Sequence, residues 1–282
     1  MRHACFLLAL SVLTGCAASP QPPAGQGAAP SLAAPGGAAP LIDLEGAEII
    51  DLTHAFDQQT LYWPNSPSAF QLEKLAYGPT SGGYFYSANA FCAPEHGGTH
   101  LDAPIHFAEG KKSAEQIPLR QLIGPAAVID VSRQAASDPD YRLTAGDVRA
   151  WEAQHGAITP GTLVLLRTGW GKRYPDRKAY FGDDTPGATD KLHFPSYGED
   201  AARLLVGERR VGALGVDTAS IDHGQSRDFI VHRIAAAAEA LGFENLANLE
   251  RLPERGAWVI ALPMKIARAS GGPLRIVALV RR

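Results

Sequence analysis

The residues best suited to chemistry in this sequence are concentrated between positions 96 and 107. This segment reads His-Gly-Gly-Thr-His-Leu-Asp-Ala-Pro-Ile-His-Phe and holds three of the chain's nine histidines and one aspartate. Imidazole and carboxylate groups bind divalent metals such as Zn²⁺ and Mn²⁺. Any one of these residues alone would be read as an ordinary loop or core residue. Four of them beside two glycines predict a metal site with room for a reacting molecule.

The four candidate groups all occupy even positions of the sequence: His96, His100, Asp102 and His106. Residues of one parity share a face of an extended chain, but a straight strand would hold the first and last about 33 Å apart. The chain must therefore bend, which Gly97-Gly98 and Pro104 allow. The same residues disfavour a helix. We expect a bend, a short strand with His100 and Asp102 as its central pair, and a second bend.

The overall composition is that of an ordinary globular protein. The chain has 282 residues, of which 45% are hydrophobic and 20% are charged, and its formal net charge is −3. This is enough apolar material for one sizeable core. The near-neutral charge balance argues against nucleic acid as a partner, because proteins that bind nucleic acid usually carry a strongly basic surface.

The start of the chain is predicted to be a targeting segment. Residues 4–13 form an apolar run that is too short to span a bilayer as a helix. The run ends in Leu-Thr-Gly-Cys16, which resembles the lipobox of bacterial lipoproteins, whose cysteine is lipidated and becomes the first mature residue. We expect residues 1–16 to be a signal peptide, with cleavage by the general signal peptidase as the alternative. In enterobacterial-type lipoproteins, a residue other than Asp after the cysteine favours the outer membrane. With Ala17 at this position, the resemblance implies that Cys16 is anchored there, on the periplasmic side of a bacterial envelope, with no other membrane contact.

Residues 17–40 consist almost entirely of Ala, Gly, Pro, Ser and Gln, which predicts a flexible tether. One folded domain is expected over residues 41–282. After removal of Cys5 and acylation of Cys16, only Cys92 remains in this domain, so no intramolecular disulfide is expected. We expect Cys92 to be a small buried hydrophobe.

The folded part of the sequence predicts an α/β or mixed α+β domain. Strands are expected at residues 48–52, 69–75, 84–91, 125–131, 161–167, 210–216, 257–262 and 274–280. Helices are expected at residues 145–155, between Thr144 and Gly156, at 198–206, and at 228–241 with Gly242 as the stop. Because strands outnumber scattered helices, a regular doubly wound fold is disfavoured.

A polar segment, Asp217-Thr-Ala-Ser-Ile-Asp222, follows the apolar strand at 210–216. Polar side chains at the end of a buried strand commonly face a site. A solvated turn in which the aspartates cap local backbone groups is the alternative, and the sequence leaves both open.

These residues resemble the cyclase family, whose members include bacterial kynurenine formamidases and isatin hydrolases. The family's hallmark, His-x-Gly-Thr-His-x-Asp-x-Pro-x-His-Phe, matches residues 96–107 at every fixed position. The likeness covers nearly the whole chain after the tether and includes residues 51–53, 62–64, 168–170, 193–195 and 217–222. It implies a swivelling β/β/α-like fold, with a mixed-strand sheet or barrel-like core flanked by a few helices, and a homodimer.

The resemblance also implies roles for residues of the motif. His96, His100 and Asp102 correspond to metal ligands, and His106 corresponds to the acid/base.

In the formamidase branch, a second metal is held by the shared aspartate and by a downstream His and Glu twelve residues apart. His232 and Glu244 have this spacing. Periodicity alone would not pair them, because twelve residues of helix set two side chains about 120° apart. Gly242 is expected to end the helix and let Glu244 turn back.

The implied activity is hydrolysis of the C–N bond of a small amide, aryl formamide or lactam, with one or two Zn or Mn ions activating water. In the formamidase branch this reaction belongs to tryptophan catabolism. His106 would move a proton between the water and the departing amine. Tyr62, Trp63 and Phe91 are expected to form an aromatic wall for a flat substrate, or else to pack in the core.

A non-catalytic metal- or solute-binding lipoprotein is the alternative function, but it would not need the spare base at His106. A serine hydrolase is disfavoured because the chain has no Gly-x-Ser-x-Gly motif.

Overall fold

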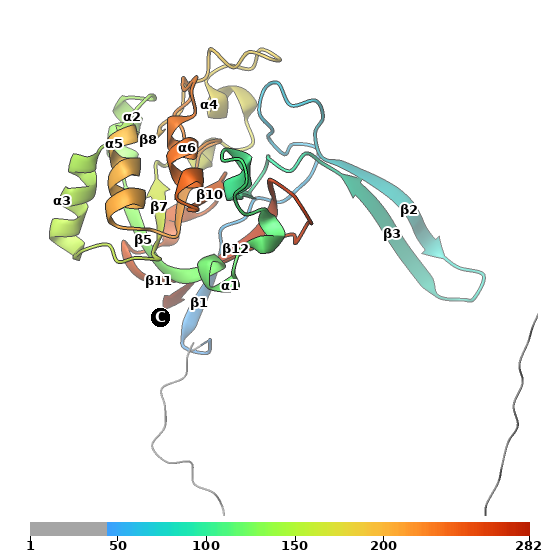
Figure 1. Cartoon of the computed structure of the whole chain (residues 1–282). Helices are drawn as coiled ribbons and strands as arrows, with labels where there is room; N and C mark the ends of the chain where they lie inside the picture. The colour runs from blue at the N-terminus through green and yellow to red at the C-terminus, as the bar shows by residue number, and fades with distance from the viewer. Residues whose placement is uncertain (1–43) are drawn as a thin grey trace, which may run out of the picture. The chain divides into compact units, whose positions relative to one another are not determined.

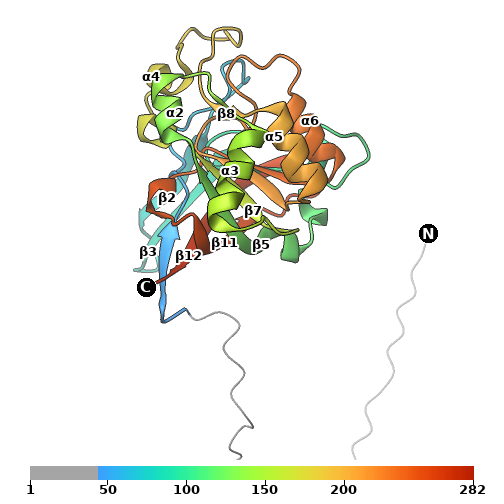
Figure 2. The same cartoon turned by 90° about the vertical axis from the view of Figure 1, so that its left-hand side faces the viewer.

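The computed structural model describes residues 44–282 (Figures 1 and 2). The expected signal peptide, the expected lipidation site Cys16 and the expected tether all lie outside the described residues. The described residues all belong to one compact unit. In the part of the chain that the structure describes, no helix has both the length and the apolarity needed to cross a membrane.

Most strands of the domain belong to one mixed sheet. The strands are β1 (Ala47–Asp51), β2 (Gln71–Pro79), β3 (Phe85–Cys92), β4 (His100–Asp102), β5 (Ile123–Asp130), β6 (Arg142–Leu143), β7 (Leu163–Arg167), β8 (Ser196–Tyr197), β9 (Ala213–Val216), β10 (Leu241–Glu244), β11 (Arg255–Pro263) and β12 (Gly271–Arg281). The α-helices are α1 (Leu119–Leu122), α2 (Ser132–Ser137), α3 (Ala145–His155), α4 (Arg177–Phe181), α5 (Glu199–Ala202) and α6 (Ile230–Ala237).

Seven of these strands close into a barrel-like ring. The order is β12, β11, β5, β7, β9, β10 and β4, and β4 pairs again with β12. The strands from β5 through β7 and β9 to β10 run parallel, and all other neighbours are antiparallel. β1 extends the sheet along the second half of β12. The predicted α/β class with a barrel-like core and few helices is confirmed.

The parallel strands are buried on both faces. In β7, Leu163 and Leu165 belong to the apolar cluster inside the barrel, whereas Val164 and Leu166 pack towards the helices. Strands buried on both sides read as continuous apolar runs rather than alternating ones. Helices α3, α5 and α6 lie side by side over the outer face (Figure 2).

Helix α3 begins and ends where its sequence predicts. The Thr144 hydroxyl accepts a hydrogen bond from the Asp147 backbone N–H at 3.1 Å, and the Asp147 carboxylate accepts one from the Thr144 N–H at 2.8 Å. This capping box satisfies two backbone donors that a helix start leaves unpaired. Gly156, with φ of 87°, ends the helix.

The region after position 228 differs most from the expectation. The alanine-rich run favours helix, yet α6 ends at Ala237 and β10 follows. β10 pairs with β9 on one side and with β4 on the other, so closure of the barrel overrides local propensity. The prediction of Gly242 as a helix stop is therefore wrong. Gly242 lies within β10, where an added Cβ would come within 2.7 Å of the Asp102 carboxylate.

Strands β2 and β3 form a long hairpin that projects from the body of the domain (Figure 1). The exposed large apolar residues of the hairpin and its turn are Leu72, Leu75, Tyr77, Tyr84, Phe85, Tyr86 and Phe91. Cys92, at the end of β3, is a free and exposed thiol. The prediction that it is buried is wrong, because it lies on the hairpin and not in the core.

Candidate metal centre

The histidine motif has the predicted bends at both ends. Gly97 and Gly98 have φ values of 157° and 56°, β4 spans His100–Asp102, and a 3₁₀ turn covers Pro104–His106. A Cβ at Gly97 would lie 2.1 Å from the ring of Tyr62, so only glycine allows this close approach. The extended reading of the motif, with a bend at each end of a short strand, is confirmed.

Closure of the barrel brings the second half of the site to the motif. Within the β10–β4 pair, Glu244 lies opposite His100, and Gly242 lies opposite Asp102. The position of Glu244 thus depends on strand pairing rather than on a turn after a helix. His232 comes from α6, which packs next to β10.

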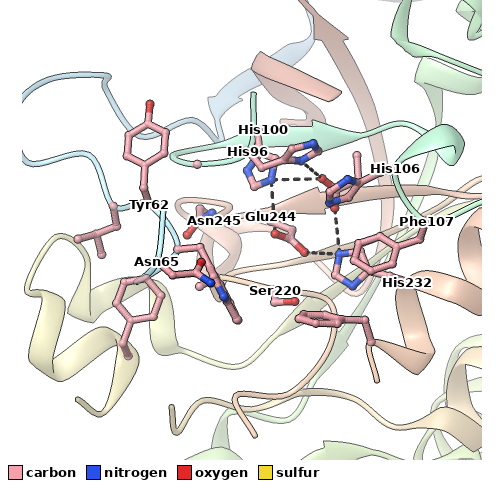
Figure 3. Close-up of a pocket in the computed structure, with 17 residues that line it drawn as sticks. Tyr62, Asn65, His96, His100, His106, Phe107, Ser220, His232, Glu244 and Asn245 are labelled. Atoms are coloured by element: carbon pink, nitrogen blue, oxygen red, sulfur yellow. Dashed lines mark hydrogen bonds and ion pairs between the residues drawn. The ribbon is translucent and has the colours of Figure 1, made fainter. Parts of the chain in front are cut away.

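The Asp102 carboxylate contacts three histidines of the cluster, His96, His100 and His232, which are labelled in Figure 3 together with Glu244. Its Oδ1 is 2.7 Å from Nδ1 of His96 and 3.3 Å from Nε2 of His100, and its Oδ2 is 3.2 Å from Nε2 of His232. Glu244 bridges two of the same histidines: Oε1 is 3.1 Å from Nε2 of His232, and Oε2 is 3.4 Å from Nε2 of His100. The structure therefore brings together all five residues expected to hold metal.

His96, His100 and His232 each direct one ring nitrogen at the carboxylates. The second ring nitrogen of each is within hydrogen-bonding distance of a further residue. The partners are the Ser270 hydroxyl for His96 (2.8 Å), the Gly98 carbonyl for His100 (3.0 Å) and the Asp222 carboxylate for His232 (2.7 Å). A hydrogen bond of this kind fixes the orientation of a metal-binding imidazole and the nitrogen it presents. Sequence reasoning missed Ser270, and it placed Asp222 only in a segment whose role it left open.

His106 differs from the other three histidines. Its ring stacks on that of His96, with centroids 3.7 Å apart and planes at 13°. No hydrogen bond joins either of its ring nitrogens to another described residue, and burial lowers its pKa to about 3. Its ring nitrogens are free to bind a metal or to exchange a proton.

Donor atoms of the described residues fall into two metal-sized groups that share Asp102. One group consists of His96, Asp102 and His106, and the other of His100, Asp102 and Glu244, with all atoms of a group within 4.8 Å of one another. The family resemblance implies a different grouping around Asp102, with His96 beside His100 and with His232 beside Glu244.

The electrostatics of the cluster favour a cation. Burial alone would lower the pKa of His100, but Asp102 and Glu244 outweigh it and raise this pKa to about 9. Burial likewise opposes the protonated form of His232, yet hydrogen bonds to Asp102, Asp222 and Glu244 raise its pKa well above the usual value. The buried Nε2 of His100 has no hydrogen-bond partner and is aimed between two carboxylates. These donors fit a divalent metal.

The cluster opens into a cavity of about 340 Å³. Tyr62 and Trp63 line it as expected. Phe91 does not, because it lies on the hairpin and stacks on Phe70 instead. The described residues that line the cavity include no lysine or arginine; they are Leu61, Tyr62, Trp63, Asn65, His96, Gly97, His100, Asp102, His106, Phe107, Phe181, Ala219, Ser220, Phe229, His232, Glu244 and Asn245.

Much of the aromatic wall comes from residues that the sequence did not single out. Phe107, Phe181 and Phe229 all line the cavity, and Phe107 packs against both Phe229 and His232. Two signals in the sequence could have identified them: Phe107 ends the histidine motif, and Phe229 lies three residues before His232.

The raised pKa of His100 predicts how the metal-free protein responds to pH. This pKa is about 9 in the folded chain, against 6.5 for an unperturbed histidine, so the folded state keeps a proton that the unfolded state releases. The stability due to this proton is fully present below pH 6.5 and is lost as the pH rises towards 9. We expect the urea midpoint of the metal-stripped protein to fall across this window.

The metal-loaded protein is the control for this measurement. Deprotonated imidazole is the form that binds metal, so a rising pH strengthens metal binding and opposes the loss of stability. A metal-stripped midpoint that stays constant or rises over the window would show that the cluster does not hold the proton.

Comparison with known proteins identifies the family. Residues 50–223, more than half of the chain, match the model of the Cyclase family. Isatin hydrolase of Roseibium aggregatum is 38% identical over 208 residues, which cover 71% of this chain and 77% of that protein. Kynurenine formamidase of Sphingopyxis alaskensis is 31% identical over 231 residues, covering 82% of this chain and 97% of that protein. The crystal structure of an isatin hydrolase bound to the product analogue thioisatinate matches with a TM-score of 0.77 and 34% identity, covering 84% of this chain and 94% of that chain. The chain therefore belongs to the cyclase family.

Proposed function

We propose that this protein is a metal-dependent hydrolase that opens the C–N bond of a small aromatic amide, aryl formamide or lactam. The observation that carries this proposal is one cavity in which buried histidines and carboxylates face an aromatic wall. The isatin hydrolase and kynurenine formamidase relatives are hydrolases of C–N bonds outside peptides, which supports the same reaction class.

We infer that the cofactor is Zn²⁺ or Mn²⁺, as one or two ions. The residues that would hold it are His96, His100, Asp102, His232 and Glu244. A divalent metal at this place supplies a nucleophilic water at neutral pH and polarises the carbonyl oxygen of the substrate.

The chain's own side chains orient the substrate and move the proton. Trp63 packs against Phe181 and Phe229, and all three line the cavity, where they would hold a flat substrate with its carbonyl towards the metal centre. Water adds to the carbonyl carbon, the C–N bond breaks, and the nitrogen leaves as an amine after taking up a proton. His106 is the histidine of the cluster with free ring nitrogens, so we assign it to carry that proton.

Replacement His106→Ala is expected to leave bound metal unchanged and to lower turnover about 10²- to 10⁴-fold, the usual contribution of a general acid/base. The measurements are the metal content of the purified protein and the absorbance-monitored hydrolysis of isatin and N-formylkynurenine. His155→Ala is the matched control, because His155 ends α3 and does not line the cavity.

Three results would contradict parts of this proposal. Loss of metal in His106→Ala would make His106 a ligand of the group it forms with His96 and Asp102. Near-normal turnover would remove its acid/base role. A wild-type protein that binds metal but hydrolyses no member of an amide panel would be a metal-binding protein without this activity.

We propose that two copies of the chain associate through the β2–β3 hairpin. A two-stranded hairpin alone is marginally stable in water, and this one exposes seven large apolar side chains. Symmetric dimers are the commonest homo-oligomers.

We expect light scattering after gel filtration to show a dimer for the wild type and a monomer after the combined replacement Tyr77→Ser and Phe85→Ser. The rings of these two residues pack edge to face, with centroids 5.2 Å apart. Leu119→Ser, at an exposed site in α1, is the control. A monomeric wild type would refute the proposal.

We also propose that Cys16 is lipidated and anchors the chain on the periplasmic face of the outer membrane, which the lipobox-like sequence at residues 13–16 supports. Expression of the full chain with a labelled fatty acid should give labelled protein in the outer-membrane fraction. Cys16→Ser should abolish the label, whereas Cys5→Ser should retain it. Retention of the label in Cys16→Ser would rule out this anchor.

A further inference from the structure

We propose that Asp222 is a positioning residue that fixes the ring of His232 so that its Nε2 presents a lone pair to the metal. This inference rests on the proposed metal-dependent function and extends it to a residue outside the expected ligand set. His232 and Asp222 are both buried, with 6% and 1% of their surface exposed.

Asp222 holds His232 at two points. Its Oδ2 accepts hydrogen bonds from the ring Nδ1 of His232 at 2.7 Å and from the backbone N–H of the same residue at 3.0 Å. Its Oδ1 accepts from the backbone N–H of Val231 at 3.0 Å and from the hydroxyl of Ser226 at 3.2 Å. Ring and backbone are therefore tied to one carboxylate, which restricts rotation of the imidazole.

The chemistry of a carboxylate selects one form of the ring. An ionised carboxylate only accepts hydrogen bonds, so Nδ1 of His232 must carry the proton that it donates. In the neutral imidazole this leaves the lone pair on Nε2. That atom lies 3.2 Å from Oδ2 of Asp102 and 3.1 Å from Oε1 of Glu244, which places the lone pair within the proposed metal centre.

This arrangement sets His232 apart from the other two oriented histidines. His100 is held by the Gly98 carbonyl and His96 by the Ser270 hydroxyl, and both of these partners are neutral. A carboxylate partner also raises the basicity of a metal-binding imidazole. His232 is therefore expected to be the most strongly donating histidine of the cluster.

The position of Asp222 in the fold suits this role. It lies in a β-bridge with Tyr197, and its carboxylate accepts from the backbone at the start of α6, the helix that carries His232. The segment 217–222 is thus not a solvated turn. Asp217, at its other end, accepts from the hydroxyl and N–H of Thr168 and from the N–H of Gly169 instead, and makes no contact with His232.

The test compares Asp222→Asn with Asp217→Asn. An amide at position 222 has only one accepting oxygen. It either turns its NH₂ group towards Nδ1, which favours the ring form with the proton on Nε2, or keeps the oxygen on Nδ1 and turns the NH₂ group towards the N–H of Val231. In both orientations the negative charge behind the ring is lost. We expect Asp222→Asn to weaken binding of Zn²⁺ or Mn²⁺, titrated against a competing chelator, by about 10- to 100-fold. Asp217→Asn removes a buried acceptor of the same type and should lower thermal stability without changing metal affinity.

Two further measurements distinguish a role in orienting the His232 ring from a general loss of structure. Long-range ¹H–¹⁵N spectra of the Zn²⁺-loaded wild type should show the His232 proton on Nδ1. In a double-mutant cycle, adding Asp222→Asn to His232→Ala should cause no further loss of metal affinity, because Asp222 acts through the ring that is missing.

The outcomes distinguish this inference from the proposed function. A wild type that binds neither metal refutes both. A wild type that binds metal while Asp222→Asn binds it equally tightly refutes only the role of Asp222. Equal losses of affinity in Asp222→Asn and Asp217→Asn, or a proton found on Nε2 of His232, would also overturn it in favour of a purely structural carboxylate.

Discussion

The buried carboxylate of Asp102 is the interaction on which the rest of this structure depends. Only 5% of the residue is exposed, and removing an unpaired carboxylate from water costs several kcal/mol. Three imidazoles compensate it, from His96, His100 and His232. Burial would raise the pKa of Asp102, but its interactions with these histidines hold the pKa well below the usual value. Glu244 adds a second buried carboxylate, so the cluster carries negative charge that bound protons or a metal must neutralise.

The closure of the barrel creates this arrangement. β4 has only three residues, yet it pairs with β10 on one edge and with β12 on the other. Its backbone groups are therefore satisfied on both sides, which holds His100 and Asp102 rigidly at the seam. Gly242 on β10 lies opposite Asp102 and leaves room for its carboxylate. The same seam thus completes the fold and assembles the ligands.

The amino-acid sequence alone predicts the part of the site that lies within the histidine motif, but not the part contributed by residues far along the chain. The bends around β4, the cap of α3 and the α/β class follow from residue types and spacing, because glycine, proline and capping residues act within a few positions. Glu244 could not be placed in this way, since the alanine-rich run before it favours helix and only strand pairing with β9 and β4 makes it a strand. Phe91 was misplaced for a related reason: alternating aromatic residues mark a strand, but they do not distinguish a cavity wall from an exposed hairpin.

Because the site is divided between the histidine motif and the later elements β10 and α6, metal binding and closure of the barrel are thermodynamically linked. His100 and Asp102 come from β4, Glu244 from β10 and His232 from α6, so the ligands converge only when these elements are packed together. A ligand that binds the folded chain and not the unfolded one stabilises the fold by mass action. The stabilisation is concentrated at the seam between β4 and β10, where the chain otherwise buries two carboxylates side by side. Without metal, protons on His100 and His232 compensate the negative charge of the two carboxylates. The stability of this seam should therefore depend on pH more than that of any other part of the barrel.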